Sequence, residues 1–330
     1  MSKILLCSHI ADIDGLGSVV LGKIVFDNFD YKLFQDPNDL EEKFRLMILN
    51  HELDCYDKIY ITDLCLMEPA ISMVNDSELK NKVLIFDHHQ RAIDLGLRKY
   101  PFATIIEADS SGKRCGTELF YRYLIDNNLL KNKMSINTFV EYTRKEDTGD
   151  WKISGDEGKN AHMLSILFNV YGKDKYVELM SDKLINNDEF IYNDDELNLI
   201  NKKILEYNNV LDTIILDMEC LVDSYGNRYG VLFSDYQYRN EITEYIKSKN
   251  NPWNVQYVVI VALDKGDYGQ KSYRRIDDSI DCNKIAMQYG GGGHDSSAAV
   301  SITKEQNIKI KTMNRKDALE YIANSSYRKD

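Results

Sequence analysis

Carboxylates and imidazoles follow three apolar segments in the N-terminal part of the chain. They are His9, Asp12, Asp14, Asp63, Asp87, His88 and His89. If each apolar segment is a strand of one parallel sheet, the groups that follow the strands reach the same carboxyl edge, where ligands bind. Imidazole together with hard carboxylate oxygens suits Mn²⁺ or Fe²⁺, whereas oxygens alone favour Mg²⁺ or Ca²⁺ and thiolates favour zinc. The pattern therefore predicts a centre for divalent ions that could also bind a phosphate group.

Each of these groups also has an ordinary structural interpretation. Asp12 or Asp14 could simply cap the helix expected after them. Asp63 could be an ordinary strand-end residue, and His88-His89 could be a surface pair. These interpretations do not explain why the groups follow consecutive strands. So many carboxylates at one edge would repel one another strongly, and a pair of cations offsets that repulsion. We therefore favour the metal centre.

Short apolar segments alternate with helical patterns along this part of the chain. Strands are expected at 3–9, 31–34, 58–63 and 82–87, and helices at 15–29 and 39–50. We expect Asp39 to cap the second of these helices and a short helix to begin at Glu68-Pro69. Because strands that alternate with helices form parallel sheets, and because these strands are nearly all apolar, we expect an α/β fold with helices on both faces of a parallel sheet.

A long, polar-faced helix expected at 193–211 divides the chain into two units. We place the first domain at 1–194, a linker helix at 195–217 and a smaller α/β domain at 218–330. Within the smaller domain, strands are expected at 219–222, 228–233 and 255–263, and helices at 240–248 and 282–289. A length of 330 residues agrees with two domains.

The composition is that of an acidic globular protein. Lys and Arg number 41 against 53 Asp and Glu, a formal net charge of −12, which disfavours binding of long duplexes because such binding needs many cationic contacts to phosphate. The 6 cysteines include no C-x-x-C pair and fit reduced thiols. The start of the chain is too short for a signal peptide, and no apolar run approaches the roughly 18 residues of a membrane helix. We therefore expect a cytoplasmic protein without membrane contact.

The motifs resemble those of the DHH phosphoesterase superfamily. The order H-x-x-D-x-D-G-x-G-S over His9–Ser18, the strand ending in Asp63 and the Asp87-His88-His89 triplet follow the family order, and a fourth motif stands at Asp147-Thr148-Gly149. The resemblance extends over almost the whole chain. The most similar subgroup is the bacterial oligoribonuclease (nano-RNase) type, which is grouped with cyclic-nucleotide phosphodiesterases.

The resemblance implies two Mn²⁺ ions, although Mg²⁺ or another divalent ion could serve. The implied ligands of the first ion are His9, Asp12 and Asp63, and those of the second are Asp14, Asp63, His88 and Asp147. Asp63 would bridge the two ions, as a shared carboxylate does in two-metal sites with a spacing of about 3.5–4 Å. His89 would donate to a phosphate oxygen or to the leaving group. Asp87 would orient an imidazole.

Three acidic residues compete for the place in the fourth motif. We favour Asp147, because Thr148-Gly149 follows it as the family pattern requires. Asp150 is then expected to be a helix cap or an exposed acid, and Glu146 is a weaker candidate. The stretch 110–117 before a helix could bind an anion through backbone N–H groups, but a capped helix start is the favoured interpretation.

The second domain is similar to the DHH-associated substrate-binding domain, on the basis of the glycine run and histidine at 290–294 and of Ala298-Ala299. The implied substrate-binding residues are Ser272, Arg274, Gly291, Gly292, Gly293 and His294. Glycines let the backbone approach a phosphate or base closely, and Arg274 could hold a phosphate bidentately. Arg275, its neighbour on a strand, would point the other way.

Alternatives remain open in this domain. Either arginine could instead balance Asp277 and Asp278, and the glycines could be a flexible turn. Three residues separate the histidine from Ala298-Ala299 where the family has two, and Val300 replaces the usual glycine. These departures affect the expected substrate preference more than the expected metal-dependent hydrolysis.

The expected function is dimanganese-dependent hydrolysis of very short RNA to mononucleotides, in a cleft between the two domains. The main alternative is a phosphatase for 3′-phosphoadenosine 5′-phosphate or a cyclic (di)nucleotide phosphodiesterase. An inorganic pyrophosphatase is disfavoured, because that branch has a basic cluster where this chain has the glycine-histidine motif. A silent nucleotide-binding protein is disfavoured by the intact ligand set. A homodimer is compatible with the sequence.

Overall fold

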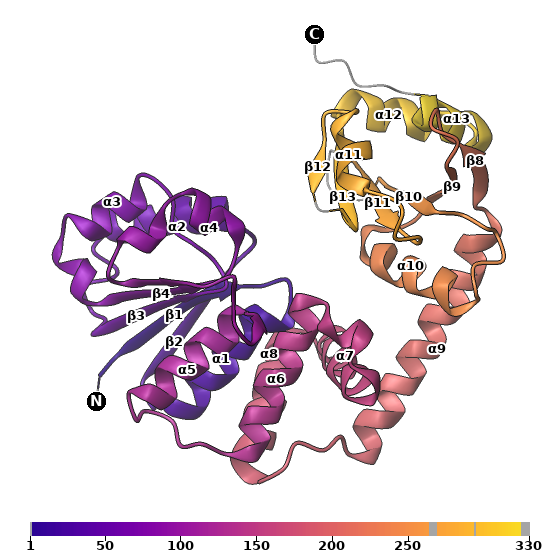
Figure 1. Ribbon diagram of the computed structural model, residues 1–330. Helices are drawn as coiled ribbons and strands as arrows, with labels where there is room; N and C mark the ends of the chain where they lie inside the picture. Colours follow the sequence, from indigo (N-terminus) through magenta and orange to yellow (C-terminus); the bar gives the residue numbers. More distant parts are fainter. Residues whose placement is uncertain (1, 264–268, 294, 325–330) are drawn as a thin grey trace. The chain divides into compact units, whose positions relative to one another are not determined.

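The computed structural model describes residues 2–263, 269–293 and 295–324 (Figure 1). The chain divides into two compact units, residues 1–201 and 202–330. The division falls within helix α9 (Asp194–Leu216), inside the range 195–217 expected for a linker helix. Among the described residues, no helix combines the length and the apolar character that a membrane crossing requires.

The first unit is built on a parallel sheet of five strands in the order β2-β1-β3-β4-β5. The strands are β1 (Ile4–His9), β2 (Phe29–Phe34), β3 (Lys58–Thr62), β4 (Val83–Asp87) and β5 (Ala103–Ile105). The chain leaves β1 toward β2 on one side and returns to β3 on the other side of β1. The direction of winding therefore reverses between β1 and β3, and ligands of such sheets bind at the carboxyl ends of the strands at that point.

Helices cover both faces of this sheet, so the expected α/β class is confirmed. They are α1 (Ile13–Val25), α2 (Pro37–Leu49), α3 (Ala70–Asn75), α4 (Gln90–Asp94), α5 (Gly116–Asp126), α6 (Met134–Thr148), α7 (Gly155–Tyr171) and α8 (Lys173–Asn186). In Figure 1, α2, α3 and α4 lie on one face, and α1 and α5 lie on the other. Single turns of 3₁₀ helix stand at 78–81, 97–99 and 150–153, and a small hairpin, β6 (Ala108–Asp109) with β7 (Gly112–Lys113), precedes α5.

The start of α2 differs from the expectation. The helix begins at Pro37, and the Asp36 carboxylate accepts hydrogen bonds from the backbone N–H groups of Asn38 (2.8 Å) and Asp39 (2.9 Å). The prediction that Asp39 caps this helix is wrong. Proline favours the first turn because its missing N–H has no intrahelical partner there, which moves the cap to the residue before it.

The second unit contains a mixed sheet of six strands in the order β12-β13-β11-β10-β9-β8. The strands are β8 (Glu219–Val222), β9 (Arg228–Phe233), β10 (Tyr257–Ala262), β11 (Gly269–Arg275), β12 (Gly292–Gly293) and β13 (Ser297–Ile302). One face packs against the end of α9 and against α10 (Arg239–Ser248). The other packs against α11 (Cys282–Met287), α12 (Lys304–Thr312) and α13 (Arg315–Asn324). A 3₁₀ turn at 236–238 precedes α10.

Candidate metal centre

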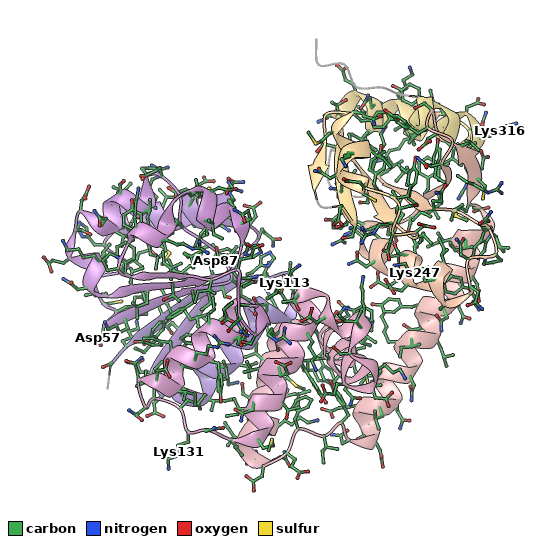
Figure 2. All side chains as sticks on the ribbon, in the orientation of Figure 1. Asp57, Asp87, Lys113, Lys131, Lys247 and Lys316 are labelled. Atoms are coloured by element: carbon green, nitrogen blue, oxygen red, sulfur yellow. The ribbon has the colours of Figure 1, made fainter. Side chains whose placement is uncertain are left out.

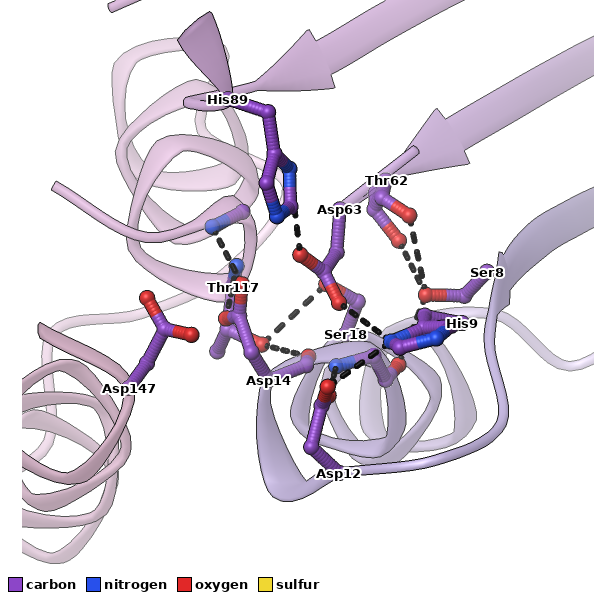
Figure 3. Close-up of polar contacts among 12 residues, drawn as sticks. Ser8, His9, Asp12, Asp14, Ser18, Thr62, Asp63, His89, Thr117 and Asp147 are labelled. Atoms are coloured by element: carbon purple, nitrogen blue, oxygen red, sulfur yellow. Dashed lines mark hydrogen bonds and ion pairs between the residues drawn. The ribbon is translucent and has the colours of Figure 1, made fainter. Parts of the chain in front are cut away.

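The loop after β1 serves both the fold and the candidate site. Asp12 has an extended backbone (φ −147°, ψ 176°), and its Oδ1 atom accepts a hydrogen bond from Gly15 N (3.0 Å). Asp12 is thus the N-cap of α1, as its ordinary interpretation predicts. Its other oxygen, Oδ2, lies 2.8 Å from His9 Nδ1 at the end of β1 (Figure 3). The same carboxylate therefore holds the helix start and the first histidine together.

His9 is oriented by both of its ring nitrogens. Nε2 lies 3.1 Å from the backbone carbonyl of Gln35, while Nδ1 lies 2.8 Å from Asp12 Oδ2 and 3.5 Å from Asp63 Oδ2. A carbonyl can only accept, so it favours the tautomer with the proton on Nε2. The lone pair of Nδ1 then faces the two carboxylates, which is the arrangement a metal-binding histidine needs.

His88 stands among three carboxylates from three different parts of the chain. Its Nε2 atom lies 3.3 Å from Asp63 Oδ1, 3.6 Å from Asp14 Oδ2 and 3.6 Å from Asp147 Oδ2. The side chain of Asp14 is fully buried, and the side chains of Asp63 and Asp147 are 2% and 20% exposed. The structure thus brings together the four side chains expected around a second ion.

Asp63 joins the two groups and has an uncommon backbone. Its φ of 59° places it in the left-handed region, which costs energy for residues other than glycine, although aspartate tolerates it better than most. A Cβ on Gly116 would lie 2.6 Å from Asp63 N, so only a glycine lets the start of α5 approach this backbone. Asp63 Oδ2 is buried and has no hydrogen-bond partner among the described residues, which leaves it available for a cation.

The start of α5 holds the carboxylate of Asp14. The backbone N–H groups of Gly116 and Thr117 donate to Asp14 Oδ2 (2.7 Å) and Oδ1 (2.8 Å). Partial positive charge at a helix N-terminus stabilises an anion. The stretch 110–117 therefore leads into a helix start that is capped by a remote carboxylate of the same chain. This contact fixes the orientation of Asp14 before any cation binds.

The Asp147-Thr148-Gly149 motif forms the C-terminal end of helix α6. Gly149 follows the helix with φ 79°, a conformation that favours glycine at this position. This end places Asp147 beside His88, whereas Asp150 forms an ion pair with Arg144 (2.7 Å). Glu146 faces His162 at 3.2 Å. Of the three competing acids, Asp147 is the one next to the other candidate ligands.

Asp87 positions the two histidines that follow it. Its Oδ1 atom accepts from the backbone N–H of His88 (2.8 Å) and lies 2.8 Å from His89 Nδ1. Figure 2 shows Asp87 at the carboxyl edge of the sheet, while Asp57 before β3 lies at the opposite edge. His89 is half-exposed, and because its Nδ1 donates to Asp87, its Nε2 can donate to a ligand only when the ring is protonated. Asp87 thus orients the His89 ring, and the contact of His89 with a substrate stays a prediction.

The electrostatics of the cluster call for a cation. Burial and the charges of Asp14 and Asp12 hold the pKa of Asp63 well above its usual range, and burial and the charge of Asp14 do the same for the pKa of Asp147. Candidate ligand atoms lie within 4.8 Å of one another in each of three groups: His9, Asp12 and Asp63; Asp14, His88 and Asp147; and Asp63, Asp87, His88 and His89. One or two divalent ions fit this donor set, and carboxylates mixed with imidazoles favour Mn²⁺ or Fe²⁺.

Without metal, the stability of the protein is expected to fall as the pH rises. Burial alone would lower the pKa of His9, but hydrogen bonds to Asp12 and Asp63 and their charges raise it from 6.5 to about 11. A raised pKa means that the folded state binds the proton more tightly, so this stabilisation is complete below pH 6.5 and is lost as the pH rises toward 11. Thermal unfolding in EDTA across this window measures the effect.

The control for this prediction is a second histidine. His9→Gln should reduce the pH dependence and leave the part that comes from His88 and His89, whose pKa values are also raised by neighbouring carboxylates. His51→Gln should leave it unchanged, because His51 is exposed and pairs only with the exposed Asp54 among the described residues. A melting temperature that rises with pH in the unsubstituted chain would contradict the assignment of the protonated state of His9.

Several supporting residues were not identified from the sequence. Ser8 Oγ donates to Gly15 O (2.8 Å) and lies 2.8 Å from Thr62 Oγ1, so it ties the ends of β1 and β3 to α1. Thr117 Oγ1 donates to the Asp14 carbonyl and lies 3.2 Å from Ser18 Oγ (Figure 3). A signal was present in the sequence, because Ser8 and Thr62 are polar residues that end two apolar segments directly before His9 and Asp63.

In the second unit, the two neighbouring arginines have different surroundings. Arg275 pairs with Asp295 (2.9 Å) and Asp278 (3.5 Å). Arg274 makes one long contact, from Nη1 to Tyr273 O (3.4 Å), and its Nε is buried without a hydrogen-bond partner among the described residues. The interpretation as a charge balanced by nearby aspartates therefore holds for Arg275. Arg274 remains the candidate for binding an anion.

The glycine run forms part of the sheet. A Cβ on Gly291 would lie 2.2 Å from Ala299 O, and a Cβ on Gly293 would lie 2.6 Å from Ser297 O. Gly292 and Gly293 form the short strand β12, which pairs with β13. Gly291 and Gly293 are thus required for close packing, and the flexible-turn interpretation is wrong for Gly292 and Gly293. Ser272 is buried on β11, and His294 lies outside the described residues.

Comparisons with known proteins agree with the expected resemblance. No protein-family model matches the chain. The chain is 28% identical over 300 residues to oligoribonuclease NrnB of Bacillus subtilis strain 168, a match that covers 89% of this chain and 72% of that protein. The solved DHH domain of a member of a ribosomal protein family has a TM-score of 0.62 at 14% identity, covering 98% of this chain and 86% of that chain.

A second solved structure with the same fold is the pGpG-specific phosphodiesterase PggH of Vibrio cholerae. Its TM-score is 0.53 at 13% identity, and the match covers 98% of this chain and 100% of that chain. The chain therefore resembles the DHH phosphoesterases both in sequence and in fold.

Proposed function

We propose that this chain, a relative of the DHH phosphoesterases, is a metal-dependent phosphodiesterase that hydrolyses very short oligoribonucleotides to mononucleotides. The observation that carries the proposal is the position of His88 Nε2, which lies 3.3–3.6 Å from carboxylates of Asp14, Asp63 and Asp147. The similarity to an oligoribonuclease supports the substrate class. The strongly acidic chain, with a net charge of −12, also fits a short ligand better than a long duplex.

We assign the first ion to His9, Asp12 and Asp63 and the second to Asp14, Asp63, His88 and Asp147. Manganese is the proposed metal, because the donor set mixes imidazole with carboxylate. When bound, a pair of divalent ions stabilises charge on the phosphate and activates water as the nucleophile. Asp63, whose two oxygens face His88 and His9 respectively, is suited to a position between the ions.

His89 is proposed to donate a proton or a hydrogen bond to the phosphate or to the leaving oxygen. Its Nδ1 is held by Asp87 Oδ1 at 2.8 Å, which orients the ring. Burial lowers the pKa of His89, but the hydrogen bond and charge of Asp87 raise it above its usual value. A protonated imidazole that is still partly accessible can act as a general acid. Asp87 is thus a positioning residue, and His89 is the residue that contacts the substrate.

One assay panel tests the proposed function. The purified chain is offered a dinucleotide, a long oligonucleotide, a cyclic mononucleotide, 3′-phosphoadenosine 5′-phosphate and pyrophosphate, each with Mn²⁺, Mg²⁺ or Zn²⁺ and each with EDTA. We expect rapid mononucleotide release from the dinucleotide, fastest with Mn²⁺ and absent with EDTA. Hydrolysis of only the cyclic compound, the bisphosphate or pyrophosphate would replace the proposed substrate. If none of the compounds is hydrolysed, the chain is a catalytically silent nucleotide-binding protein and the proposed function is wrong.

Asp147→Asn and Asp150→Asn form a matched pair. Asp147→Asn should lower kcat by about 10²-fold or more, because a neutral amide is a poor partner for a divalent cation. Asp150→Asn should change kcat by less than about threefold, since it breaks only a partly exposed ion pair with Arg144. Steady-state kinetics on the dinucleotide with Mn²⁺ measures both. The reverse ranking would transfer the ligand role to Asp150.

Arg274→Ala and Arg275→Ala form a second matched pair on one strand. If the Arg274 guanidinium binds a phosphate equally in the ground and transition states, Arg274→Ala should raise KM about tenfold and leave kcat nearly unchanged. Arg275 already pairs with Asp295, so Arg275→Ala should change KM by less than about twofold. Equal effects of the two substitutions on KM would refute a specific role for Arg274.

A further inference from the structure

The second unit contains a cavity of about 280 Å³ that lies apart from the candidate substrate-binding residues. Its lining consists of Val222, Asp223, Ser224, Tyr229, Val231, Tyr257, Val259, Tyr273, Tyr289 and Ile322. Tyr273 packs in the apolar cluster formed with α11 and α13. Arg274, the next residue on β11, points to the opposite face because neighbours on a strand alternate. The cavity is therefore on the other side of the sheet from Arg274.

Four of the ten lining residues are tyrosines, in two stacked pairs. The rings of Tyr229 and Tyr257 have centroids 5.1 Å apart at an angle of 9°, and those of Tyr273 and Tyr289 are 6.2 Å apart at 14°. Tyr229 and Tyr257 are register partners on the parallel strands β9 and β10. The positions of these rings are thus fixed by the sheet and by mutual stacking.

The hydroxyls of these tyrosines differ in their partners. Tyr257 donates to Asp223 Oδ2 (3.1 Å). In the part of the chain that the structure describes, the hydroxyls of Tyr229, Tyr273 and Tyr289 form no hydrogen bond to the protein, and none of them belongs to the fully buried polar atoms without a partner, so they open into the cavity. A molecule in the cavity can therefore form hydrogen bonds with these three hydroxyls, each of which can donate or accept.

The carboxylate of Asp223 in the cavity wall is fully hydrogen-bonded within the protein. Asp223 accepts hydrogen bonds from Tyr225 N, Asn227 N, Asn227 Nδ2 and Tyr257 Oη, at 2.9, 2.9, 3.0 and 3.1 Å. Four donors occupy the acceptor sites of the Asp223 carboxylate. An organic cation in the cavity would therefore find no free carboxylate oxygen to pair with. The described residues of the lining include no lysine or arginine, so a phosphate is not favoured either. The cavity suits a neutral ligand that both donates and accepts hydrogen bonds.

We propose that this cavity binds a nucleobase, as part of a nucleoside or of a mononucleotide whose phosphate stays in solvent. At about 30 Å³ per water molecule, the volume of about 280 Å³ corresponds to about nine waters, which is room for one bicyclic heteroaromatic ring. The ring edge carries donors and acceptors that match the hydroxyls of Tyr229, Tyr273 and Tyr289. Its faces contact apolar side chains of the lining, among them Val231 and Val259. The site is independent of the proposed hydrolytic centre.

The test is calorimetric titration of the full-length chain with adenosine and with guanosine in the presence of EDTA. Nucleosides carry no phosphate, and EDTA removes metal, so hydrolysis and the metal centre do not contribute to the signal. We expect one binding site per chain for at least one of the two nucleosides. The double substitution Tyr229→Phe with Tyr289→Phe keeps both rings and removes two hydroxyls, and should weaken binding about tenfold.

Two control variants show whether the nucleoside binds in this cavity. Tyr225→Phe alters an exposed tyrosine of the same hairpin that does not line the cavity, and should bind as the unsubstituted chain does. Asp63→Asn should also bind normally. No binding at millimolar nucleoside would mean that the cavity holds only water. Unchanged affinity in the double variant, or loss of binding in Asp63→Asn, would also overturn the proposal. Circular dichroism and melting temperatures show that each variant is folded.

Discussion

Asp63→Asn is expected to abolish metal-dependent hydrolysis, with kcat lower by at least about 10³-fold on every substrate. Asp63 lies 3.3 Å from His88 and 3.5 Å from His9, so it contacts both groups of candidate ligands. Asparagine has nearly the same shape and also tolerates the left-handed backbone of this position. The substitution therefore removes the charge while it preserves the fold. Steady-state kinetics and a Mn²⁺ titration measure the two consequences.

The metal titration should show weaker binding and loss of at least one ion per chain. Asp54→Asn is the matched control, because Asp54 is exposed and pairs only with the exposed His51 among the described residues, and it should keep normal activity. If Asp63→Asn retains more than about a tenth of the activity, the two ions do not share this carboxylate, and the proposed arrangement of the centre is wrong.

Gly15→Ala is expected to destabilise the first unit by more than about 2 kcal/mol, as severe overpacking of a buried position does. A Cβ at Gly15 would lie 2.1 Å from the carbonyl oxygen of His9. Helix α1 would have to move away from β1, and this displacement would shift Asp12 and Asp14 relative to His9. Urea unfolding measures the loss of stability, and a Mn²⁺ titration of the remaining folded protein should show weaker binding.

A second glycine provides the comparison. At Gly292 a Cβ would meet nothing closer than 3.8 Å among the described residues, so Gly292→Ala should change the free energy of unfolding by less than about 0.5 kcal/mol. Equal unfolding curves for Gly15→Ala and the unsubstituted chain would mean that α1 and β1 have room to separate. Close packing would then not be the reason for a glycine at this position of the motif.

The strands β1 to β4 and β8 to β10 were predictable because their residues are largely apolar and turns or helical patterns separate them, whereas β13 (Ser297–Ile302) was not predicted. The segments 219–222 and 228–233 form β8 and β9 with the expected bounds. The strand β5 (Ala103–Ile105) was not predicted, because three residues at the edge of a sheet carry too little pattern. The cap of α2 was misplaced by three residues, because two aspartates flank Pro37 closely and either could cap a helix start in this sequence.

The sequence identified which residues belong to the candidate site, but it did not predict the contacts that hold them in place. Strand ends identified His9, Asp63 and His88, because parallel strands bring their carboxyl ends to one edge. The contact of Asp14 with Gly116 joins residues 102 positions apart and follows no local pattern. The cavity in the second unit was also beyond prediction, since Tyr229, Tyr257 and Tyr273 converge only through the register of three strands and Tyr289 follows α11.

The attachment of Asp14 to the start of α5 has a consequence for protein synthesis. A nascent chain that has not yet extended past Thr117 carries most of the acidic side chains of the centre but lacks the two backbone N–H groups that orient Asp14. Asp147 emerges from the ribosome later still. The growing polypeptide therefore passes through a period in which it cannot capture ions in the finished arrangement, and maturation of the centre follows the translation of α6.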